Sequence, residues 1–559
     1  MPDVSERILT AGTVLQLLPE IVLIATATLI YVLGAFLSVR WLWSWIAGAG
    51  LVAAALALSQ VGGAGMSGPL ADDAFGLFVR WFALGIGALF VMLAGRIAMR
   101  PQGSEVVGSL LLAVVGVMVV STSQELVMLF LGLELISIPT YTLLFLGRKN
   151  IGSYESTVKY FFLNILASAF MLYGFSFLYG LAGSTHLVDV QAALASGVVQ
   201  QKGWSLMAAL AVLFIFAGLG FKIAAVPFHF YAPDVYQGTT NANAAILSIL
   251  PKVAGLAALI RVLLIAMPTM EPIGWRIALI VAILTMTIGN ILALWQDSLR
   301  RLLAYSSIAH AGYMLIGLAV AFAIAYSGDT SATGFDGVAA ILLYMTVYAV
   351  ATLGTFAAMT YLGDERHEVD GIDELAGLGR SQPFAAITLA VFMFSLAGIP
   401  PLAGFWGKLA LFGSALTVDA DIQGSSPLRG WFVWLAIIGV INATIAAVYY
   451  LRIVGVMYFR KPLATPQADG GGGAWLAMAL SAMFIVGTGA ATGSLWESSL
   501  RASSSLRDTN QTSQENAVLD EVEQLRIAIG HPADFAIDRG VPDTDAVVRS
   551  GTSATAASR

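Results

Sequence analysis

Four ionisable residues lie inside apolar stretches that are typical of membrane-spanning helices. Three are lysines: Lys222 in FIFAGLGFKIAAVPFHF, Lys252 in AAILSILPKVAGLAALI and Lys408 in GIPPLAGFWGKLALFG. The fourth is Glu134, in LVMLFLGLELISIPTYTLLF. A charged side chain at the bilayer centre costs at least ~2.5–3.5 kcal/mol on insertion scales, and such residues usually pair, face a wet interior and carry ions. The four residues together indicate charge movement through a membrane.

A buried lysine beside a carboxylate is a switchable proton site, because burial disfavours the ammonium form and a nearby carboxylate favours it. Glu134 and Lys222 are the candidates for such a pair, and Lys252, next to Pro251, can receive the proton from Lys222. The second half of the chain offers no acid equivalent to Glu134. It has His310, whose neutral imidazole can pass a proton through either nitrogen. We therefore predict a relay from Glu134 and Lys222 through Lys252 and His310 to Lys408.

Each of these residues has a structural alternative. Glu134 could be an interhelical hydrogen bonder, the lysines could snorkel to an interface, and His310 could be a packed histidine bonded to a carbonyl. His229, beside Pro227, is expected to be structural or gating. Intramembrane ionisable residues are functional by default, which favours the relay. Other charged residues near helix ends are expected to be interfacial, namely Glu125, Lys159 and Arg261.

The elements that must hold these residues are membrane helices. The chain has 559 residues, of which 58% are hydrophobic and 11% charged, against about 25% charged in soluble domains. A spanning helix needs roughly 20 mostly apolar residues, and about fourteen such segments occur. Continuous rather than alternating apolar runs argue against a β-barrel. We predict an all-α polytopic membrane protein with spans at 15–37, 43–62, 74–95, 105–121, 125–146, 157–180, 204–231, 240–266, 274–295, 302–324, 337–361, 384–413, 431–458 and 474–494.

Several functional classes are disfavoured by composition. The chain has no cysteine, so it offers no thiolate ligand for zinc or iron–sulfur clusters. Its five histidines are scattered without metal-binding spacing. A net charge of −6 without a basic patch gives no signal for nucleic acid. The N-terminus lacks the features of a removable signal peptide, so 15–37 is expected to be a first span.

Lysine and arginine in the loops predict the orientation, since they concentrate on the cytoplasmic side. Alternate loops carry pairs such as Arg148 with Lys149 and Arg300 with Arg301. The opposite loops carry mainly Lys202, Arg276 and Arg429, alongside several acids. The protein is expected to be a multi-pass protein of the cell inner (plasma) membrane, and the bias predicts its orientation. Both termini are expected on the external, periplasmic side.

Two of the expected helices contain breaks at corresponding places. The seventh has Gly218, Gly220 and Pro227, and the twelfth has Gly398 and the pair Pro400–Pro401. Interrupted helices in two halves are a pointer to the inverted repeats of transporters and their midplane site. We predict helices 1–3 in 1–104, two inverted five-helix repeats in 105–266 and 267–460, a last helix in 461–495, and a polar, disordered external tail in 496–559. Within the tail, 517–529 has helical spacing, and 362–383 is expected to be an interfacial loop with a short helix.

The stretches around these residues resemble a known family. LGLELISIPTYTLLFL, ESTVKYFFLNILASAFMLYGFSFLYG, GLGFKIAAVPFHFYAPDVYQG, RRLLAYSSIAHAGY and SLAGIPPLAGFWGK are similar to the antiporter-like, proton-pumping membrane subunits of respiratory complex I. FKIAAVPFHFYAPDVYQG, with a lysine at 408, favours the subunit N family of NADH-quinone oxidoreductase. With the helix count, the resemblance covers roughly 15–495.

The resemblance implies roles residue by residue. Glu134, Lys222, Lys252 and Lys408 match the family's charged positions in helices five, seven, eight and twelve, and His310 matches a polar position in helix ten. No cofactor is expected on this chain, because NADH and quinone (ubiquinone or menaquinone) are substrates of the whole complex. The implied partners are the other membrane-arm subunits, including adjacent antiporter-like subunits, and the lipid bilayer.

Two alternative functions share these motifs or these buried charges. One is a subunit of a multisubunit Na⁺/H⁺ antiporter or membrane-bound hydrogenase. The other is a structural scaffold in which buried charges only hold helices together. The stretch 218–238 and Lys408 favour the complex I reading.

Overall fold

The computed structural model describes residues 11–37, 39, 41–61, 69–96, 99, 101–195, 205–267, 273–327, 335–363, 367–418, 428–462 and 468–507. Within these ranges the chain is nearly all helical, and the β pairing consists of three isolated bridges. Twelve of the described helices are long and apolar enough to cross a membrane. The predicted all-α membrane fold is therefore confirmed. The predicted short helix at 517–529 lies outside the described residues.

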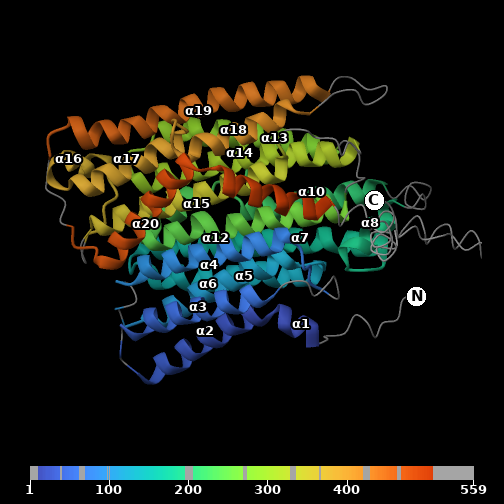
Figure 1. The fold of residues 1–559 in the computed structure, drawn as a ribbon, viewed down its shortest axis with the longest axis horizontal. Coiled ribbons are helices and arrows are strands. Elements are labelled where there is room, and N and C mark those ends of the chain that lie inside the picture. Colours follow the sequence, from blue (N-terminus) through green and yellow to red (C-terminus); the bar gives the residue numbers. More distant parts are fainter. Residues whose placement is uncertain are drawn as a thin grey trace, which may run out of the picture. The chain divides into compact units, whose positions relative to one another are not determined.

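The N-terminal part is a group of long helices that pack side by side (Figure 1). Ion-paired side chains tie its first and third long helices together, since Arg80 Nε lies 2.7 Å from Glu20 Oε1 with both side chains buried. Only small parts of the outer helices are covered by protein, and large apolar side chains such as Trp45 are exposed on them. The helices are α1 (Ala11–Gln16), α2 (Leu18–Phe36), α3 (Leu42–Gln60) and α4 (Ala74–Ala94).

The middle of the chain contains the first interrupted helix. α10 ends at Lys222, residues 223–231 form turns, and the short α11 follows. Backbone groups freed by the interruption find partners in the protein: Val226 N donates to Thr285 Oγ1 at 3.0 Å, and Tyr231 OH donates to Phe221 O at 2.9 Å. The elements here are α5 (Gly103–Thr122), α6 (Leu126–Gly147), α7 (Ile151–Ala182), α8 (Leu187–Ala195), α10 (Ser205–Lys222), α11 (Ala232–Gly238), α12 (Asn241–Ile260) and the π-helical η3 (Arg261–Ala266).

The second interrupted helix lies near the end of the chain. α17 ends at Ala397, Gly398 follows with a φ of 87°, which suits glycine, and α18 begins at Ala403. The elements are α13 (Ile273–Leu294), α14 (Leu299–Ser327), α15 (Gly337–Tyr361), the 3₁₀ turn η4 (Ile372–Leu375), α16 (Leu378–Ser381), α17 (Pro383–Ala397), α18 (Ala403–Leu416), α19 (Leu428–Phe459) and α20 (Gly472–Ala490). Both interruptions fall among the glycines and prolines that predicted them.

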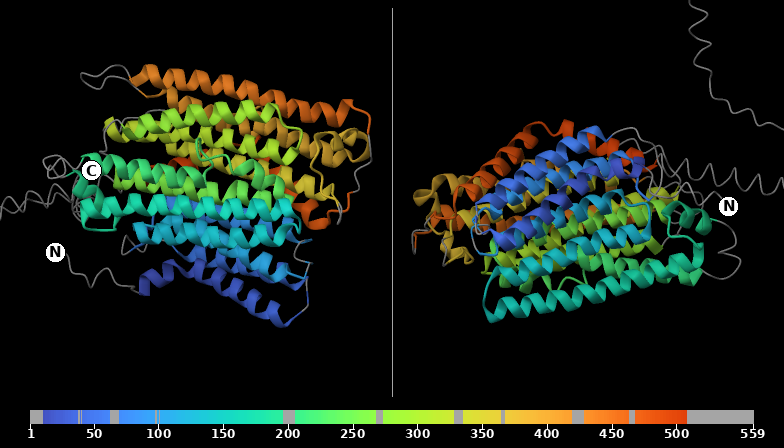
Figure 2. Two further views of the ribbon diagram at one scale, coloured as in Figure 1. Left: turned by 180° about the vertical axis from the view of Figure 1, so that it is seen from behind. Right: turned by 90° about the horizontal axis from the view of Figure 1, so that it is seen from below.

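Three of the helices form a buried interior in residues 11–507. The candidate spans of α12 and α15 are completely buried, and that of α14 is 94% buried, whereas those of α2 and α19 are only 28% and 33% buried. Figures 1 and 2 show α12 and α15 between the outer helices. α13 and α14 approach closely, since a Cβ at Gly289 would lie 2.7 Å from the backbone N of Ala309. The interior helices carry Lys252 and His310.

The prediction of a disordered tail from residue 496 is wrong for the first residues of that segment. Residues 493–507 form a helix, one face of which is buried at Ser499, Ala502, Ser503 and Leu506. Spacings of three and one between buried residues are those of a helix face. Serine hydroxyls satisfy backbone carbonyls within it, as when Ser499 Oγ donates to Leu495 O at 2.9 Å. The serine-rich composition therefore concealed an amphipathic helix.

The charged segment between α15 and α17 contains two short helical turns, as expected of it. Glu368 in this segment accepts from Arg148 at 2.7 Å and from Arg300 at 3.2 Å. It also accepts at 3.2 Å from the backbone N of Asn241, the first residue of α12. The segment thus fastens one end of α12 to α6 and α14.

Candidate functional site

Glu134 and Lys222 lie together inside the helical bundle. Lys222 Nζ, on the last residue of α10, is 3.6 Å from Glu134 Oε1 on α6, and the two side chains are 3% and 23% exposed. Two hydroxyls complete the pair: Lys222 donates to Ser137 Oγ at 2.6 Å, and Ser168 Oγ donates to Glu134 Oε1 at 2.6 Å. Ser137 is one turn after Glu134 and therefore on the same face of α6. The ammonium thus sits between a carboxylate and a hydroxyl.

Lys252 lies on the buried helix α12 and has a different environment. Its Nζ donates to both the carbonyl and the hydroxyl of Ser307 on α14. Tyr348 OH donates to the same hydroxyl at 2.7 Å, and the Tyr348 ring centroid is 5.1 Å from Nζ. Among the residues that the structure describes, Lys252 has no carboxylate within ion-pairing distance. The Ser307 hydroxyl and carbonyl and the face of the Tyr348 ring therefore stabilise the Lys252 ammonium, in place of a counter-ion such as Glu134 at Lys222.

Lys252 and Lys222 come from helices in direct contact. A Cβ at Gly255 would lie 3.2 Å from the Cβ of Lys222, so α12 packs closely on the end of α10 at this point. Gly255 is three residues after Lys252, and residues so spaced share a helix face. Lys252 is therefore on the side of α12 that faces Lys222, about one turn away.

His310 is held by two tyrosines. Its Nδ1 is 2.5 Å from Tyr344 OH, and its Nε2 is 2.9 Å from Tyr450 OH. Tyr450 OH also bonds to Ser306 Oγ. Since a neutral imidazole donates from one nitrogen and accepts at the other, the two phenols must play opposite roles. The alternative of a histidine bonded to a carbonyl is not what the structure shows.

Lys408 forms hydrogen bonds at the break between α17 and α18. Its Nζ donates to the carbonyls of Leu396 and Ala397, each at 2.9 Å. These carbonyls end α17, where intrahelical donors are missing and the helix carries partial negative charge. The Tyr313 ring centroid lies 5.1 Å from Nζ. In the described parts of the chain, no acid is within ion-pairing distance of this lysine.

The five predicted residues form a row with gaps rather than one hydrogen-bonded chain. Between Lys252 and His310, the link is the Tyr348 ring, whose centroid is 4.9 Å from that of the imidazole. Between His310 and Lys408, the link is Tyr313, with a centroid distance of 5.9 Å to the imidazole. A proton crosses these gaps only if a side chain moves or water enters. Such a row can store protons at separate stations and release them stepwise.

Comparisons with known proteins identify the family of this chain. The family model described as NADH:quinone oxidoreductase/Mrp antiporter, TM, matches residues 123–424. NADH-quinone oxidoreductase subunit N of Trichlorobacter lovleyi is 40% identical over 391 residues, which are 69% of this chain and 74% of that protein. NADH-quinone oxidoreductase subunit N 1 of Rhizobium meliloti is 38% identical over 77% of this chain and 84% of its own length. This chain belongs to the NADH-quinone oxidoreductase subunit N family.

Chains of solved membrane complexes share the fold of this subunit N family member. A chain of respiratory complex I from Thermus thermophilus with bound aureothin matches with a TM-score of 0.69 and 28% identity, covering 86% of this chain and 98% of that one. A chain of the Mrp complex from Dietzia sp. matches with a TM-score of 0.72 and 21% identity, covering 91% of this chain and 100% of the other. At 21% identity the likeness shows the fold alone.

Several residues of the site were not predicted from the sequence. Ser307 lies three residues before His310, and Tyr344 and Tyr348 are spaced by four, so each could have been found as a polar neighbour on a helix face. Arg80 was also missed, although it lies inside the predicted span 74–95 just as the lysines lie inside theirs. It pairs with Glu20 at 2.7 Å, and both side chains are buried.

Arg261 was expected at an interface, and that prediction is wrong. Its side chain is fully buried and lies 2.5 Å from Asp73 Oδ2 through Nη1. Nε also donates to the carbonyl of Ser121 at 2.9 Å. Proximity to a helix end suggested water, but α4 and α5 cover this end of α12. Among the described residues, no group of three His, Asp or Glu side chains is arranged to hold a metal ion.

Proposed function

We propose that this chain translocates protons across the membrane as the antiporter-like subunit N of NADH-quinone oxidoreductase. Translocation would be coupled to electron transfer from NADH to quinone in other subunits. The observation that carries the proposal is the buried Glu134–Lys222 pair, 3.6 Å apart, at the end of an interrupted helix. The relatives at 35–40% identity that bear the subunit N name support the same assignment.

The first step is a change in the Glu134–Lys222 distance. While the pair is closed, the carboxylate stabilises the ammonium. When it opens, the ammonium is left in a low-dielectric interior with the Ser137 hydroxyl as its nearest partner and becomes a better proton donor. Because Lys222 ends α10 and residues 223–231 are not helical, a small shift of this segment changes the distance without disturbing the rest of the bundle.

The second step is transfer to Lys252 and onward. Lys252 has no acid to hold its proton, so its charge is stabilised only by the Ser307 oxygens and the Tyr348 ring. Water entering between the Tyr348 and His310 rings would connect it to the imidazole. His310 then passes the proton between its two nitrogens, each of which already contacts a phenol.

Lys408 is the last station of the proposed relay. Its ammonium is bound to carbonyls of the broken helix, which hold a cation by dipoles instead of by a full charge. Loss of the proton would leave a neutral amine, which can still donate to both carbonyls but no longer carries the charge that their dipoles stabilise. Protonation of Lys408 would therefore be coupled to the shape of the break. We propose that the two interrupted regions belong to two inverted repeats, 105–266 and 267–460.

Partners and orientation follow from the family and from loop charge. The chain would lie in the inner (plasma) membrane with both termini outside, because this orientation puts Arg148, directly after α6, and Arg300 and Arg301, in the first turn of α14, on the cytoplasmic side. It would contact other membrane-arm subunits, including adjacent antiporter-like subunits. NADH and quinone would bind elsewhere in the complex, with no cofactor on this chain.

The test uses the native complex, purified through a tag on this chain. Identification of NADH-oxidising partner subunits would support the assignment, and recovery of an assembly without them would refute it in favour of the antiporter or hydrogenase reading. Lys252→Ala complex, reconstituted in vesicles, should pump markedly fewer protons per NADH oxidised. Lys149→Ala is the matched control, since Lys149 is an exposed lysine outside the row.

A further inference from the structure

A long apolar cavity lies between α4, α15, α20 and the helix at 493–507. Its volume is about 680 Å³, and its lining is mostly apolar. Lining residues on α4 run from Ala74 to Leu89, which is about 22 Å at 1.5 Å per residue. This length is more than half of the roughly 30 Å hydrocarbon core of a bilayer. None of the five relay residues lines it.

The cavity opens to the surroundings of the bundle. Trp81 is 44% exposed, Leu77 39% and Phe484 37%, although all three line it. Gly85 is exposed as well, and a Cβ added there would meet nothing within 4 Å. An apolar hollow open at bilayer depth is accessible to hydrocarbon chains and loses packing contacts if it stays empty.

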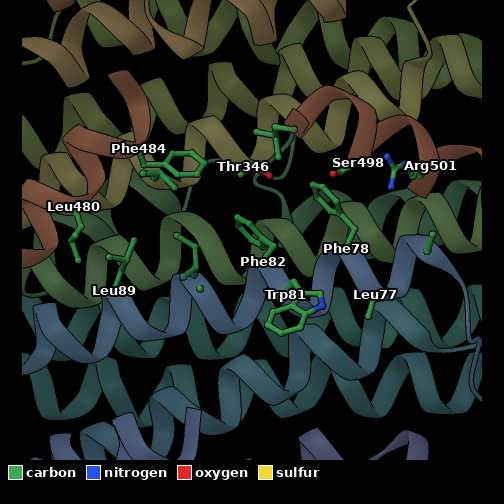
Figure 3. A pocket seen from close by; sticks show the side chains of 15 residues that line it. Leu77, Phe78, Trp81, Phe82, Leu89, Thr346, Leu480, Phe484, Ser498 and Arg501 are labelled. Carbon is green, nitrogen blue, oxygen red and sulfur yellow. The ribbon is translucent and has the colours of Figure 1, made fainter. Parts of the chain in front are cut away.

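Two of the polar lining residues, Ser498 and Arg501, lie at one end of the cavity, whereas Thr346 lies nearer its middle (Figure 3). Figure 3 shows Ser498 and Arg501 beside Leu77 and Phe78, whereas Leu89 and Leu480 lie toward the other end. Arg501 pairs with Glu497 at 3.7 Å, but both side chains are largely exposed, so the pair is weak. Arg501, on the helix at 493–507, thus places a guanidinium at one end of the apolar cavity (Figure 3). A guanidinium in this position suits an anionic headgroup.

We propose that this cavity binds one acyl chain of an anionic phospholipid, with the phosphate at Arg501. The occupant is too small to be a helix, since a helix of about 10 Å diameter and 22 Å length would fill about 1,700 Å³. A quinone would have a tail of suitable shape, but its headgroup is neutral and gains nothing from the guanidinium. The lipid would fill the space between the N-terminal helices and α15 and α20, and the helix at 493–507 would provide its headgroup site.

The test is native mass spectrometry of the whole complex purified in nanodiscs that contain phosphatidylglycerol and phosphatidylcholine. We expect this subunit to be released with phosphatidylglycerol bound. Gly85→Leu should abolish retention by filling the cavity, whereas Gly48→Leu, at an α3 glycine that also has open space around it, should retain the lipid. Arg501→Gln should reduce the preference for phosphatidylglycerol about fivefold, and Arg429→Gln should not.

Three results would overturn the proposal. Equal retention of phosphatidylglycerol by Gly85→Leu and Gly48→Leu would show that the lipid binds elsewhere. Retention of quinone in place of phospholipid would identify a different occupant. An unchanged lipid preference in Arg501→Gln would remove the headgroup site, and this variant tests the idea even if Gly85→Leu fails to assemble.

Discussion

Replacement of Glu134 by glutamine removes one charge from the proposed switch while keeping its shape. Glutamine has the same length, and its carbonyl oxygen can still accept from Ser168 Oγ, which bonds the native carboxylate at 2.6 Å. Lys222 keeps its bond to Ser137. The change therefore tests the charge of the pair rather than its packing.

The size of the effect follows from the distance between the charges. At 3.6 Å and an effective dielectric constant of about 20, two unit charges attract by roughly 4–5 kcal/mol. Removing one partner of a buried pair typically costs about 3–5 kcal/mol, because the other charge is left uncompensated. The Glu134 side chain is 23% exposed, so the lower part of this range, about 3 kcal/mol, is expected. Such a change is roughly a hundredfold in the equilibrium for protonating Lys222.

A second variant separates the relay from assembly. In Glu134→Gln with Lys222→Met, no unpaired charge is left, so the helices should pack and the complex should assemble in near-native amounts. Pumping should nevertheless be lost, because neither residue can exchange a proton. The scaffold hypothesis predicts the opposite, namely that activity follows assembly.

The assay is proton uptake per NADH oxidised by the purified complex in sealed vesicles. Glu134→Gln should lower the rate of NADH-driven proton uptake at least tenfold, because protonation of Lys222 shifts roughly a hundredfold. The loss can take two forms: fewer protons per NADH oxidised, or NADH oxidation that slows in step with pumping. The reasoning is refuted if assembled Glu134→Gln complex pumps at the native rate, or if the double variant recovers pumping together with assembly.

Three further changes test neighbouring parts of the structure. Ser307→Ala removes one acceptor of Lys252 and should slow vesicle acidification about tenfold or more, since a hydrogen bond to a charged group contributes about 1.5–3 kcal/mol; an unchanged rate would exclude this hydroxyl from the relay. Lys408→Met leaves two carbonyls of α17 without their donor and should abolish pumping in complex that still assembles; retained pumping would remove Lys408 from the row. Arg261→Met leaves Asp73 buried and unpaired, which should destabilise the subunit by about 3–5 kcal/mol and reduce the yield of assembled complex, and adding Asp73→Asn should restore that yield.

The helices and the charged residues could be predicted from the sequence because both are local signals. A run of about 20 apolar residues predicts a span, and the observed α3 and α15 begin and end within two residues of the predictions. Lys222 and Lys408 stand out against such runs, and glycine with proline marks the interruptions beside them. These features need no knowledge of the neighbouring helices.

Partners distant in sequence could not be predicted in this way. Arg261 and Asp73 are paired across 188 positions, and no local pattern indicates that α4 covers this end of α12. The Ser307–Tyr348 contact likewise depends on how α14 packs against α15. The helix at 493–507 was missed for another reason: its serines resemble a disordered tail in composition, while its four buried positions are apparent only by spacing.

The central claim is that the buried row carries the protons, and Lys222 is its best-placed member. The most direct measurement is the number of protons translocated per NADH oxidised by fully assembled Lys222→Ala complex in sealed vesicles, beside Lys149→Ala complex prepared in the same way. We predict a large loss of proton translocation in Lys222→Ala and native values in Lys149→Ala. Native proton translocation by assembled Lys222→Ala complex would contradict the relay.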